Sequence, residues 1–266
     1  MTGIRILLLM IALSLVVLPA HTRKRETGFL NRTVTSFKQE YRYQVYVPWK
    51  WVKSKKWPVI LFLHGAGERG DDGLIQTQVG IGAAIRHFPD RFASLVVMPQ
   101  CRRNSWWTHP EMEAMALKAL DETIKDFNGD PERLYLTGLS LGGYGTWSIG
   151  SKFPAKFAAL APICGGVRPP SRLPPQTASQ FSDPGADAYK IVAHKIGKTP
   201  VWIFHGGADQ VVPVAESRHM SEALKEAGGN VKYSEYEGVG HNSWDKAYAE
   251  PDFMPWLMSH RRMSSH

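Results

Sequence analysis

"LYLTGLSLGG", residues 134–143, decides how the chain folds. An apolar run leads into Gly138-Leu-Ser-Leu-Gly142, so a single serine, Ser140, stands between two glycines. A G-x-S-x-G sequence between a strand and a helix is typical of a nucleophile elbow, a sharp turn in which bulky neighbours would clash. The segment therefore predicts a nucleophilic serine at the end of a buried strand. The alternative is a small-residue helix start that only packs closely, the role we expect for Gly143 and Gly145.

Strand-like and helix-like segments alternate on both sides of this turn. Short β-type segments at Val34–Phe37 and Tyr41–Val47 predict an opening hairpin. Continuous apolar runs then predict buried strands at 57–65, 94–100, 133–140, 157–166 and 200–209, and residues 231–238 alternate like a further strand. Helical spacing covers 108–127 and 216–229. The pattern predicts the α/β class, with a mostly parallel central sheet and helices on both faces.

The longest helical segment carries its own boundary signals. Thr108 and Glu111 match the T-x-x-E capping box, which predicts that the helix begins at Thr108. Asn128 and Gly129 follow the last helical position and predict its end.

The N-terminal segment predicts export rather than a folded element. Arg5 precedes the apolar run Ile6–Leu18, and Pro19 and Ala20 follow it. This pattern is typical of a secretory signal peptide, and the run is shorter than the roughly 20 apolar residues of a membrane-spanning helix. We expect residues 1–20 to be cleaved near Ala20, which leaves a secreted or periplasmic protein. An uncleaved anchor is the alternative.

Length and composition fit one large domain. The chain has 266 residues, of which 43% are hydrophobic and 21% charged, as in ordinary globular proteins. Residues 21–266 are therefore expected to form a single catalytic domain. The proline- and serine-rich stretch Arg168–Tyr189 is long for a loop inside a compact domain, so we expect a functional or a mobile loop there.

The charge, the cysteines and the missing metal motifs bear on the partners and cofactors of the protein. The net charge is +8, but the basic residues are scattered, so we expect neither nucleic acid as a partner nor stable membrane association after cleavage. Export would permit a disulfide between Cys101 and Cys164, which spacing alone cannot decide, and two buried free thiols are the alternative. Zinc-binding spacings and a phosphate-loop lysine are missing from the sequence, so neither a metal nor a cofactor is expected.

A serine hydroxyl needs a base to take its proton and an acid to orient that base. A nucleophile elbow predicts the chain order serine, acid, histidine. Asp209 follows one of the later predicted strands and His241 follows the last one, so the sequence supplies this order. Because the carboxyl ends of parallel strands meet at one edge of a sheet, these side chains can converge on Ser140.

Several acids and histidines compete for these roles. They are Asp183, Asp187 and Asp245 among the acids, and His64, His194 and His205 among the bases. None of these acids follows a strand in the required order. His64 and His205 stand within "LHG" and "FHG" at strand ends, where we expect them to order loops by hydrogen bonding.

The tetrahedral intermediate of acyl transfer also needs donors for its oxyanion. One is expected from the backbone N–H of Leu141, next to the nucleophile. The other is expected from the N–H of Ala66, which glycines flank in "LHGAGERG", residues 63–70. Glu68 follows in this loop, either as a substrate contact or as an ion-pair or loop-capping residue.

Six segments together resemble a known group of proteins. They are "LHGAGERG" (63–70), "PQC" (99–101) followed by tryptophan, "TGLSLGGYGTW" (137–147), "APICGG" (161–166), "HGGADQVVPV" (205–214) and "GHNSWDKAY" (240–248). In this combination the chain resembles secreted α/β-hydrolase-fold serine esterases. The similarity is to the predicted-peptidase and polyhydroxybutyrate-depolymerase-like group, related to carbohydrate esterase family 1 with its acetylxylan and feruloyl esterases. It spans about Val34 to Trp256.

The resemblance implies the α/β-hydrolase fold and serine hydrolysis of carboxylic esters. It implies Ser140 as nucleophile, Asp209 as acid, His241 as base and the Ala66 and Leu141 amides as oxyanion donors. It also suggests that Trp106 or Trp107 and Trp244 line the substrate pocket, with packing as the equal alternative.

The expected substrate is a small-molecule or polysaccharide-linked ester with an acetyl, feruloyl or short acyl group. A serine peptidase of the prolyl-oligopeptidase-like type is the alternative, followed by a binding protein on a hydrolase scaffold. The sequence leaves the oligomeric state open.

Overall fold

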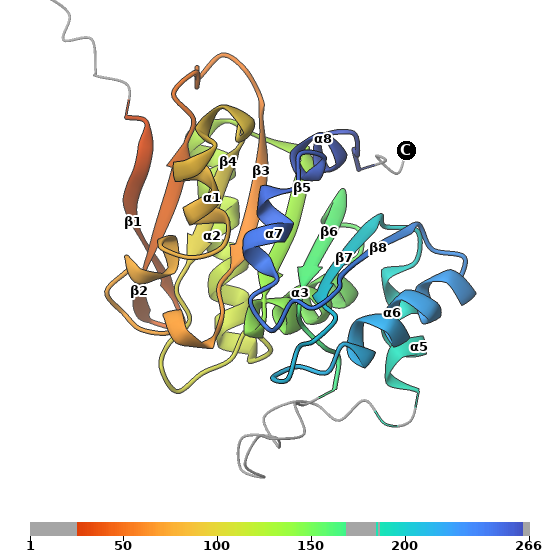
Figure 1. The fold of residues 1–266 in the computed structure, drawn as a ribbon. Coiled ribbons are helices and arrows are strands. Elements are labelled where there is room, and N and C mark those ends of the chain that lie inside the picture. The colour runs from red at the N-terminus through yellow and green to blue at the C-terminus, as the bar shows by residue number, and fades with distance from the viewer. Residues whose placement is uncertain (1–25, 169–184, 186, 263–266) are drawn as a thin grey trace, which may run out of the picture.

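One sheet of eight strands forms the centre of the computed structural model, which describes residues 26–168, 185 and 187–262 (Figure 1). The strands are β1 (Gly28–Ser36), β2 (Gln39–Val47), β3 (Trp57–Leu63), β4 (Leu95–Pro99), β5 (Gly129–Leu139), β6 (Ala159–Ile163), β7 (Val201–Gly206) and β8 (Val231–Tyr236). The α-helices are α1 (Ile81–His87), α2 (Pro110–Phe127), α3 (Leu141–Lys152), α5 (Ala188–Ile196), α6 (Ala215–Glu226), α7 (Trp244–Ala249) and α8 (Phe253–Met258). Short 3-10 helices occupy Ala66–Glu68, Ile75–Thr77 and Pro89–Arg91.

The strand order is β1-β2-β4-β3-β5-β6-β7-β8. β1 pairs with β2 and β2 with β4 in antiparallel fashion, whereas β4, β3 and β5 to β8 pair in parallel. This confirms the predicted α/β-hydrolase fold with its opening hairpin. β4 lies on one side of β3 and β5 on the other, so the order reverses at β3. Ligands of open α/β sheets bind at such a switch point, outside the carboxyl ends of the strands.

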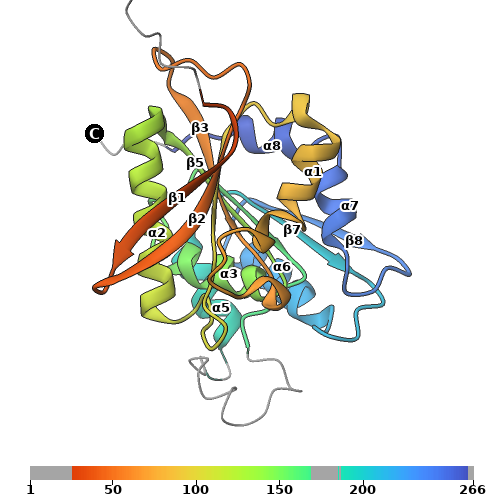
Figure 2. The same ribbon diagram turned by 90° about the vertical axis from the view of Figure 1, so that its left-hand side faces the viewer.

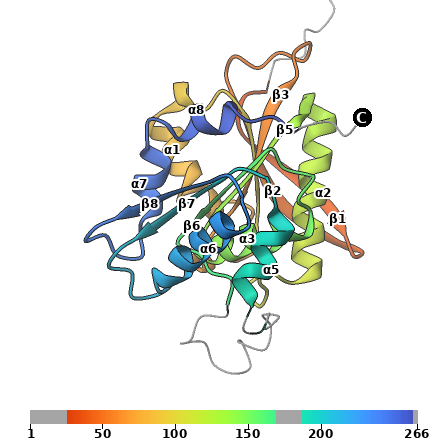
Figure 3. The same cartoon turned by 90° about the vertical axis from the view of Figure 1, so that its right-hand side faces the viewer.

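Helices cover both faces of the sheet (Figures 2 and 3). α2, α3, α5 and α6 contribute to one hydrophobic core, and α1, α7 and α8 contribute to the other. The sequence of β3 contributes to both cores, because Val59 and Leu61 lie in the first core while Ile60 and Phe62 lie in the second. Successive side chains of a strand point to opposite faces, so a strand covered on both sides is apolar throughout.

The two ends of α2 show where boundary signals succeed and fail. The predicted end is confirmed, since Asn128 adopts the left-handed conformation (φ 53°) that terminates helices. The predicted capping box is wrong, because His109 is the N-cap residue and no side chain caps the helix. Pro110 is the first helical residue, a position that proline favours because its missing N–H is not needed there.

The signal peptide, the long loop and the disulfide are the remaining expectations about the fold. The predicted signal peptide, residues 1–20, lies outside the described residues, as does most of the segment Arg168–Tyr189. Cys101 and Cys164 are both buried free thiols, so the alternative without a disulfide holds. Within the described ranges, no helix combines the length and the apolar character that crossing a membrane requires.

Candidate active site

Ser140 lies at the turn from β5 into α3, with a strained backbone of φ 50° and ψ −114°. Glycines make this turn possible. A Cβ atom on Gly142 would lie 1.9 Å from the carbonyl oxygen of Leu63, and one on Gly138 would lie 2.3 Å from that of Gly142. Neither position has room for a side chain, so the G-x-S-x-G pattern follows from the close approach of the turn to β3.

Gly143 and Gly145 serve the packing of α3 behind the turn. A Cβ atom on Gly143 would lie 2.7 Å from the carbonyl oxygen of Ile163, and one on Gly145 would lie 2.5 Å from Cβ of Trp107. These contacts match the packing role expected for both glycines.

The structure brings Ser140, Asp209 and His241 together at the carboxyl ends of β5, β7 and β8. The Ser140 hydroxyl lies 2.9 Å from Nε2 of His241. On the other side of the ring, Nδ1 of His241 lies 2.7 Å from Oδ2 of Asp209. A carboxylate can only accept, so Nδ1 carries the ring proton and donates a hydrogen bond to Asp209. Nε2 is then free to accept the proton of Ser140.

Asp209 is fully enclosed and held by several donors. Its Oδ1 atom accepts from the backbone N–H groups of Val211, at 2.8 Å, and Val212, at 3.0 Å. Burial of the carboxyl raises its pKa, but the hydrogen bonds from His205, His241, Val212 and Val211 outweigh burial and leave the pKa well below its usual range. Asp209 is therefore a permanent anion beside His241.

His205 is a second partner of Asp209 that the sequence did not assign to the site. Its Nδ1 atom lies 2.6 Å from the Ser217 hydroxyl. Its Nε2 atom lies 3.0 Å from the carbonyl oxygen of Val212 and 3.2 Å from Oδ2 of Asp209. Because both of these oxygens accept, Nε2 carries the proton and Nδ1 accepts from Ser217. The expected loop-ordering role is confirmed. The sequence "FHGGAD" could also have indicated the contact with Asp209, since His205 precedes this acid by only four residues.

His64 fixes the loop that follows β3. Its Nδ1 atom donates to the carbonyl oxygen of Gly65 at 2.6 Å, and its Nε2 atom accepts from the N–H of Cys101 at 2.9 Å. Burial lowers the pKa of His64 to about 4, so the ring is neutral at neutral pH. A Cβ atom on Gly65 would lie 3.8 Å from Cβ of Ser140, which places this loop beside the nucleophile.

The predicted oxyanion donors occupy the starts of two helical segments. Ala66 is exposed and begins the 3-10 helix Ala66–Glu68, directly after the Gly65 position that faces Ser140. Leu141 is the first residue of α3. The N–H groups of a first helical turn have no partner within their own helix, so both elements can offer donors to an anion.

The tryptophans divide into one core residue and two at the site. Trp107 is fully buried, and its indole N–H donates to the carbonyl oxygen of His64 at 2.9 Å. The structure thus gives it a packing role in place of the suggested substrate contact. Trp106 packs against Tyr144 and Val212 in a small apolar cluster. Trp244 meets the ring of His241 edge-on, with centroids 5.5 Å apart.

Tyr144 and Val212 were not predicted to belong to the site. Tyr144 lies one helical turn after Ser140, and Val212 follows Asp209 in the acid loop. Spacing along the helix could have indicated Tyr144. Val212 could not be found in this way, because it meets Tyr144 only through the fold.

Glu68 turns back towards its own loop. Its Oε2 atom lies 4.0 Å from Nδ1 of His64, and would lie 3.0 Å from a Cβ atom on Gly65. Burial raises the pKa of this carboxyl. These contacts favour the loop-capping alternative, and a direct contact with substrate stays a prediction.

Of the other competing residues in the described part of the chain, Asp187, Asp245 and His194 make no hydrogen bond or ion pair with Ser140, Asp209 or His241. Asp187 precedes α5, Asp245 accepts from Asn242 at 2.8 Å, and His194 is exposed in the last turn of α5. Asp183 lies outside the described residues.

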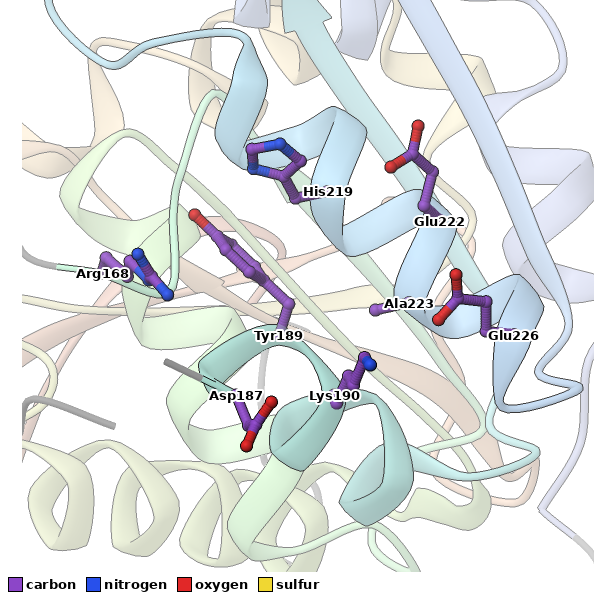
Figure 4. Close-up of a pocket in the computed structure, with 8 residues that line it drawn as sticks. All are labelled: Arg168, Asp187, Tyr189, Lys190, His219, Glu222, Ala223 and Glu226. Carbon is purple, nitrogen blue, oxygen red and sulfur yellow. The ribbon is translucent and has the colours of Figure 1, made fainter. Parts of the chain in front are cut away.

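A separate groove of about 320 Å³ lies between α5 and α6 (Figure 4). Its lining combines cations, carboxylates and two aromatic rings: Arg168, Asp187, Tyr189, Lys190, His219, Glu222, Ala223 and Glu226. It includes none of Ser140, Asp209 and His241. The groove therefore does not hold the reacting groups.

One set of side chains could hold a metal ion. Cys164, Asp209 and His241 each offer a ligand atom, and these atoms lie within 4.8 Å of one another. The sequence gave no metal signal here, because the three residues come from separate loops rather than from one spaced motif.

The chain is similar to known hydrolases in sequence and in fold. Residues 99–250 match the dienelactone hydrolase family. The chain is 31% identical over 224 residues to an uncharacterized secreted protein of Arthroderma benhamiae, covering 76% of the chain and 23% of that protein. It is 27% identical over 145 residues to poly(3-hydroxyalkanoate) depolymerase C of Paucimonas lemoignei, covering 50% of the chain and 32% of that protein.

A solved structure of a thermostable esterase superposes with a TM-score of 0.72 at 32% identity, covering 88% of the chain and 64% of the esterase. The chain spans only about a quarter to a third of the length of the two curated relatives. The family match nevertheless covers more than half of the chain and includes Ser140, Asp209 and His241. The chain belongs to the dienelactone hydrolase family, and its fold is that of the α/β-hydrolases.

Proposed function

We propose that the protein hydrolyses carboxylic esters through an acyl-enzyme on Ser140. The observation that carries this proposal is the continuous chain of hydrogen-bonding atoms from Ser140 through His241 to Asp209. A base in contact with the nucleophile, and oriented in turn by an acid, is the arrangement that activates a serine.

In the first half-reaction, Oγ of Ser140 attacks the ester carbonyl carbon while Nε2 of His241 takes the hydroxyl proton. The carbonyl oxygen becomes an oxyanion, to which the N–H groups of Ala66 and Leu141 donate. His241 then gives its proton to the departing alkoxide, so that the alcohol leaves and the acyl group stays on Ser140.

In the second half-reaction, a water molecule gives a proton to Nε2 of His241 and attacks the acyl carbon. The second tetrahedral intermediate collapses, the proton returns to Oγ of Ser140, and the carboxylic acid leaves. Asp209 stays ionised throughout, because its hydrogen bonds keep its pKa low. Its charge stabilises the imidazolium that forms twice in each cycle.

We further propose that the substrates carry acetyl, feruloyl or other short acyl groups on a small or polysaccharide-linked alcohol. Supporting this are the apolar cluster of Trp106, Tyr144 and Val212 and the ring of Trp244 beside His241. We also propose secretion or periplasmic export with cleavage of residues 1–20 near Ala20, and the relative described as a secreted protein supports the secretion.

The decisive experiment compares the wild type with Ser140→Ala. We expect the variant to keep its fold by circular dichroism, to lose hydrolysis of p-nitrophenyl acetate and to escape labelling by a fluorophosphonate. Removal of a nucleophile of this kind costs several orders of magnitude in rate. Activity retained in the variant would refute the assignment.

A panel of matched substrates separates the remaining possibilities. Acetyl, butyryl and feruloyl esters define the acyl preference. An ester and an amide of the same acyl group distinguish an esterase from a peptidase, which would use the same residues. A wild type that fails to react with the fluorophosphonate would favour a non-catalytic binding protein.

A further inference from the structure

The thiol of Cys164 lies beside the catalytic acid and base without a role in the proposed reaction. Cys164 follows β6 directly, and its backbone N–H donates to the carbonyl oxygen of Phe204 at 2.9 Å. Its φ angle of 40° lies in the left-handed region, which is uncommon for residues other than glycine. The fold therefore holds this cysteine in a fixed and costly conformation.

The residues around the thiol are of types that commonly bind metal ions. Its sulfur, a carboxylate oxygen of Asp209 and a ring nitrogen of His241 lie within 4.8 Å of one another. Thiolate sulfur, imidazole nitrogen and carboxylate oxygen are the atoms with which proteins bind zinc. Ligand atoms of a tetrahedral zinc site lie roughly 3.3–3.8 Å apart, so a separation of 4.8 Å would have to close by about 1–1.5 Å, and Oδ2 of Asp209 and Nδ1 of His241, now 2.7 Å apart, would have to move apart.

A buried hydroxyl group, that of Ser243, lies two residues after His241 in the chain. The Ser243 hydroxyl is fully buried and has no nitrogen or oxygen partner among the described residues. Its residue is tied to the proposed base, because the backbone N–H of Ser243 donates to the carbonyl oxygen of His241 at 2.8 Å. A buried hydroxyl that lacks an oxygen or nitrogen partner is uncommon and can serve as a further oxygen donor.

We infer that Cys164, Asp209 and His241 form an inhibitory site for a thiophilic divalent cation such as Zn²⁺ or Cd²⁺. The binding step is a ligand exchange without oxidation or reduction. The cation takes the sulfur as thiolate, and the thiol proton passes to solvent. The carboxylate and the neutral imidazole then complete the set of protein ligands.

Coordination stops catalysis whichever ring nitrogen of His241 is used. If the cation binds Nδ1, the ring proton must move to Nε2, which then cannot accept the proton of Ser140. If the cation binds Nε2, the lone pair that would take this proton is occupied. This inference rests on the proposed function for its inhibitory effect, but not for cation binding itself.

His241 is the side from which a cation can enter. Its side chain is 19% exposed, whereas that of Asp209 is 0% exposed and Cys164 is also fully buried. The loop carrying His241 follows Gly238, which has a φ of 67°, and Gly240, where a Cβ atom would meet nothing within 4 Å. The carbonyl groups of Val239 and Gly240 lie close against Gly206, and the Val239 oxygen accepts from the N–H of Ala208 at 2.9 Å, so the backbone of this loop is held in place and entry depends on the side chain of His241.

The binding test uses Cd²⁺ alone, because a cadmium thiolate has an ultraviolet charge-transfer band. Titration of Ser140→Ala, which has no nucleophile, should produce this band with one equivalent of bound cation. Adding Cys164→Ala or Cys164→Ser should abolish it, and adding Cys101→Ala should leave it intact. Cys101 is the matched control, since it is the other buried free cysteine. A band that persists without Cys164, or one lost with Cys101, would overturn the inference.

The inhibition test uses Zn²⁺ with the full-length wild type and an ester substrate. Cys164→Ser, which lacks the sulfur ligand, should need a Zn²⁺ concentration higher by more than ~10–100-fold for the same inhibition, because a change outside the ligand set already costs that much metal affinity. Cys101→Ala should be inhibited as strongly as the wild type. Equal inhibition of Cys164→Ser would show that Zn²⁺ acts elsewhere. If no ester is hydrolysed, the proposed function fails while the cadmium band still decides the metal site. If hydrolysis occurs without the band, the metal site alone fails.

Discussion

At the scale of single residues, His205 and His241 contact the same carboxylate oxygen. Both reach Oδ2 of Asp209, His241 at 2.7 Å and His205 at 3.2 Å. His205 is fully buried, with its other ring nitrogen against Ser217. It therefore never contacts substrate, and it influences the reaction only by positioning Asp209.

This arrangement leads to a prediction for His205→Phe, which keeps a ring but removes the N–H donor. A hydrogen bond to a charged group contributes about 1.5–3 kcal/mol, so kcat/KM for p-nitrophenyl acetate should fall roughly 10- to 100-fold. His205→Gln keeps a donor at the end of its side chain and should recover part of the loss. Unfolding temperatures serve as the control for global damage. Equal rates for the phenylalanine and glutamine variants would contradict a role through Asp209.

At the scale of elements, the site depends on how closely α3 approaches β3. A Cβ atom on Gly142 would overlap the Leu63 carbonyl group, with its oxygen at 1.9 Å and its carbon at 2.5 Å. Both are backbone atoms of a strand in the middle of the sheet, so they cannot move aside. The helix that begins at the nucleophile would have to shift as a whole.

We therefore predict that Gly142→Ala lowers the free energy of unfolding by at least about 2–3 kcal/mol, as overpacking does. Urea denaturation measures this change. The matched control is Gly67→Ala, where a Cβ atom would meet nothing within 4 Å, and its free energy of unfolding should stay within about 0.5 kcal/mol of the wild type. A similar loss in both variants would contradict the prediction that the lack of space at Gly142 sets the cost.

The elements and the site differ in how far the sequence predicts them. Buried strands and the nucleophile turn around Ser140 are each encoded by a short stretch of sequence, an apolar run or G-x-S-x-G, so both could be predicted from the sequence alone. The start of α2 could not, because a capping box at Thr108 competes with a proline two residues later. Trp106 and Trp107 also look alike in sequence, and only the packing of α3 shows which one is buried. Cys164 stands beside Asp209 through the fold alone, which no spacing reveals.

At the scale of the whole molecule, His64 makes the stability depend on pH. Burial lowers its pKa in the folded protein to about 4, whereas an unfolded chain has a histidine pKa of about 6.5. Above pH 6.5 both states are neutral and the stability is complete. Between pH 6.5 and pH 4 the unfolded state binds a proton that the folded state does not, so stability falls as the pH falls.

The expected loss over this window is about 3 kcal/mol, from a shift of about two and a half pH units. Urea denaturation at several pH values should show it in the wild type and show a smaller slope in His64→Asn. The neighbouring Glu68 titrates in both proteins, so the difference between their curves isolates His64. If the variant does not fold, the His64 ring signal in the wild type, followed by NMR, should still stay neutral down to pH 5. Protonation at pH 6 would contradict the prediction.

The backbone of Ser140 makes the active site a liability for stability. A residue other than glycine at φ 50° and ψ −114° costs the folded state about 1–3 kcal/mol. Selection for activity alone would maintain that cost, which implies a trade-off between activity and stability at this position. Ser140→Gly should therefore be more stable than Ser140→Ala by about 1 kcal/mol, although both lack the hydroxyl and both should be inactive. Thermal unfolding of the two variants would measure how much stability this chain gives up for its nucleophile.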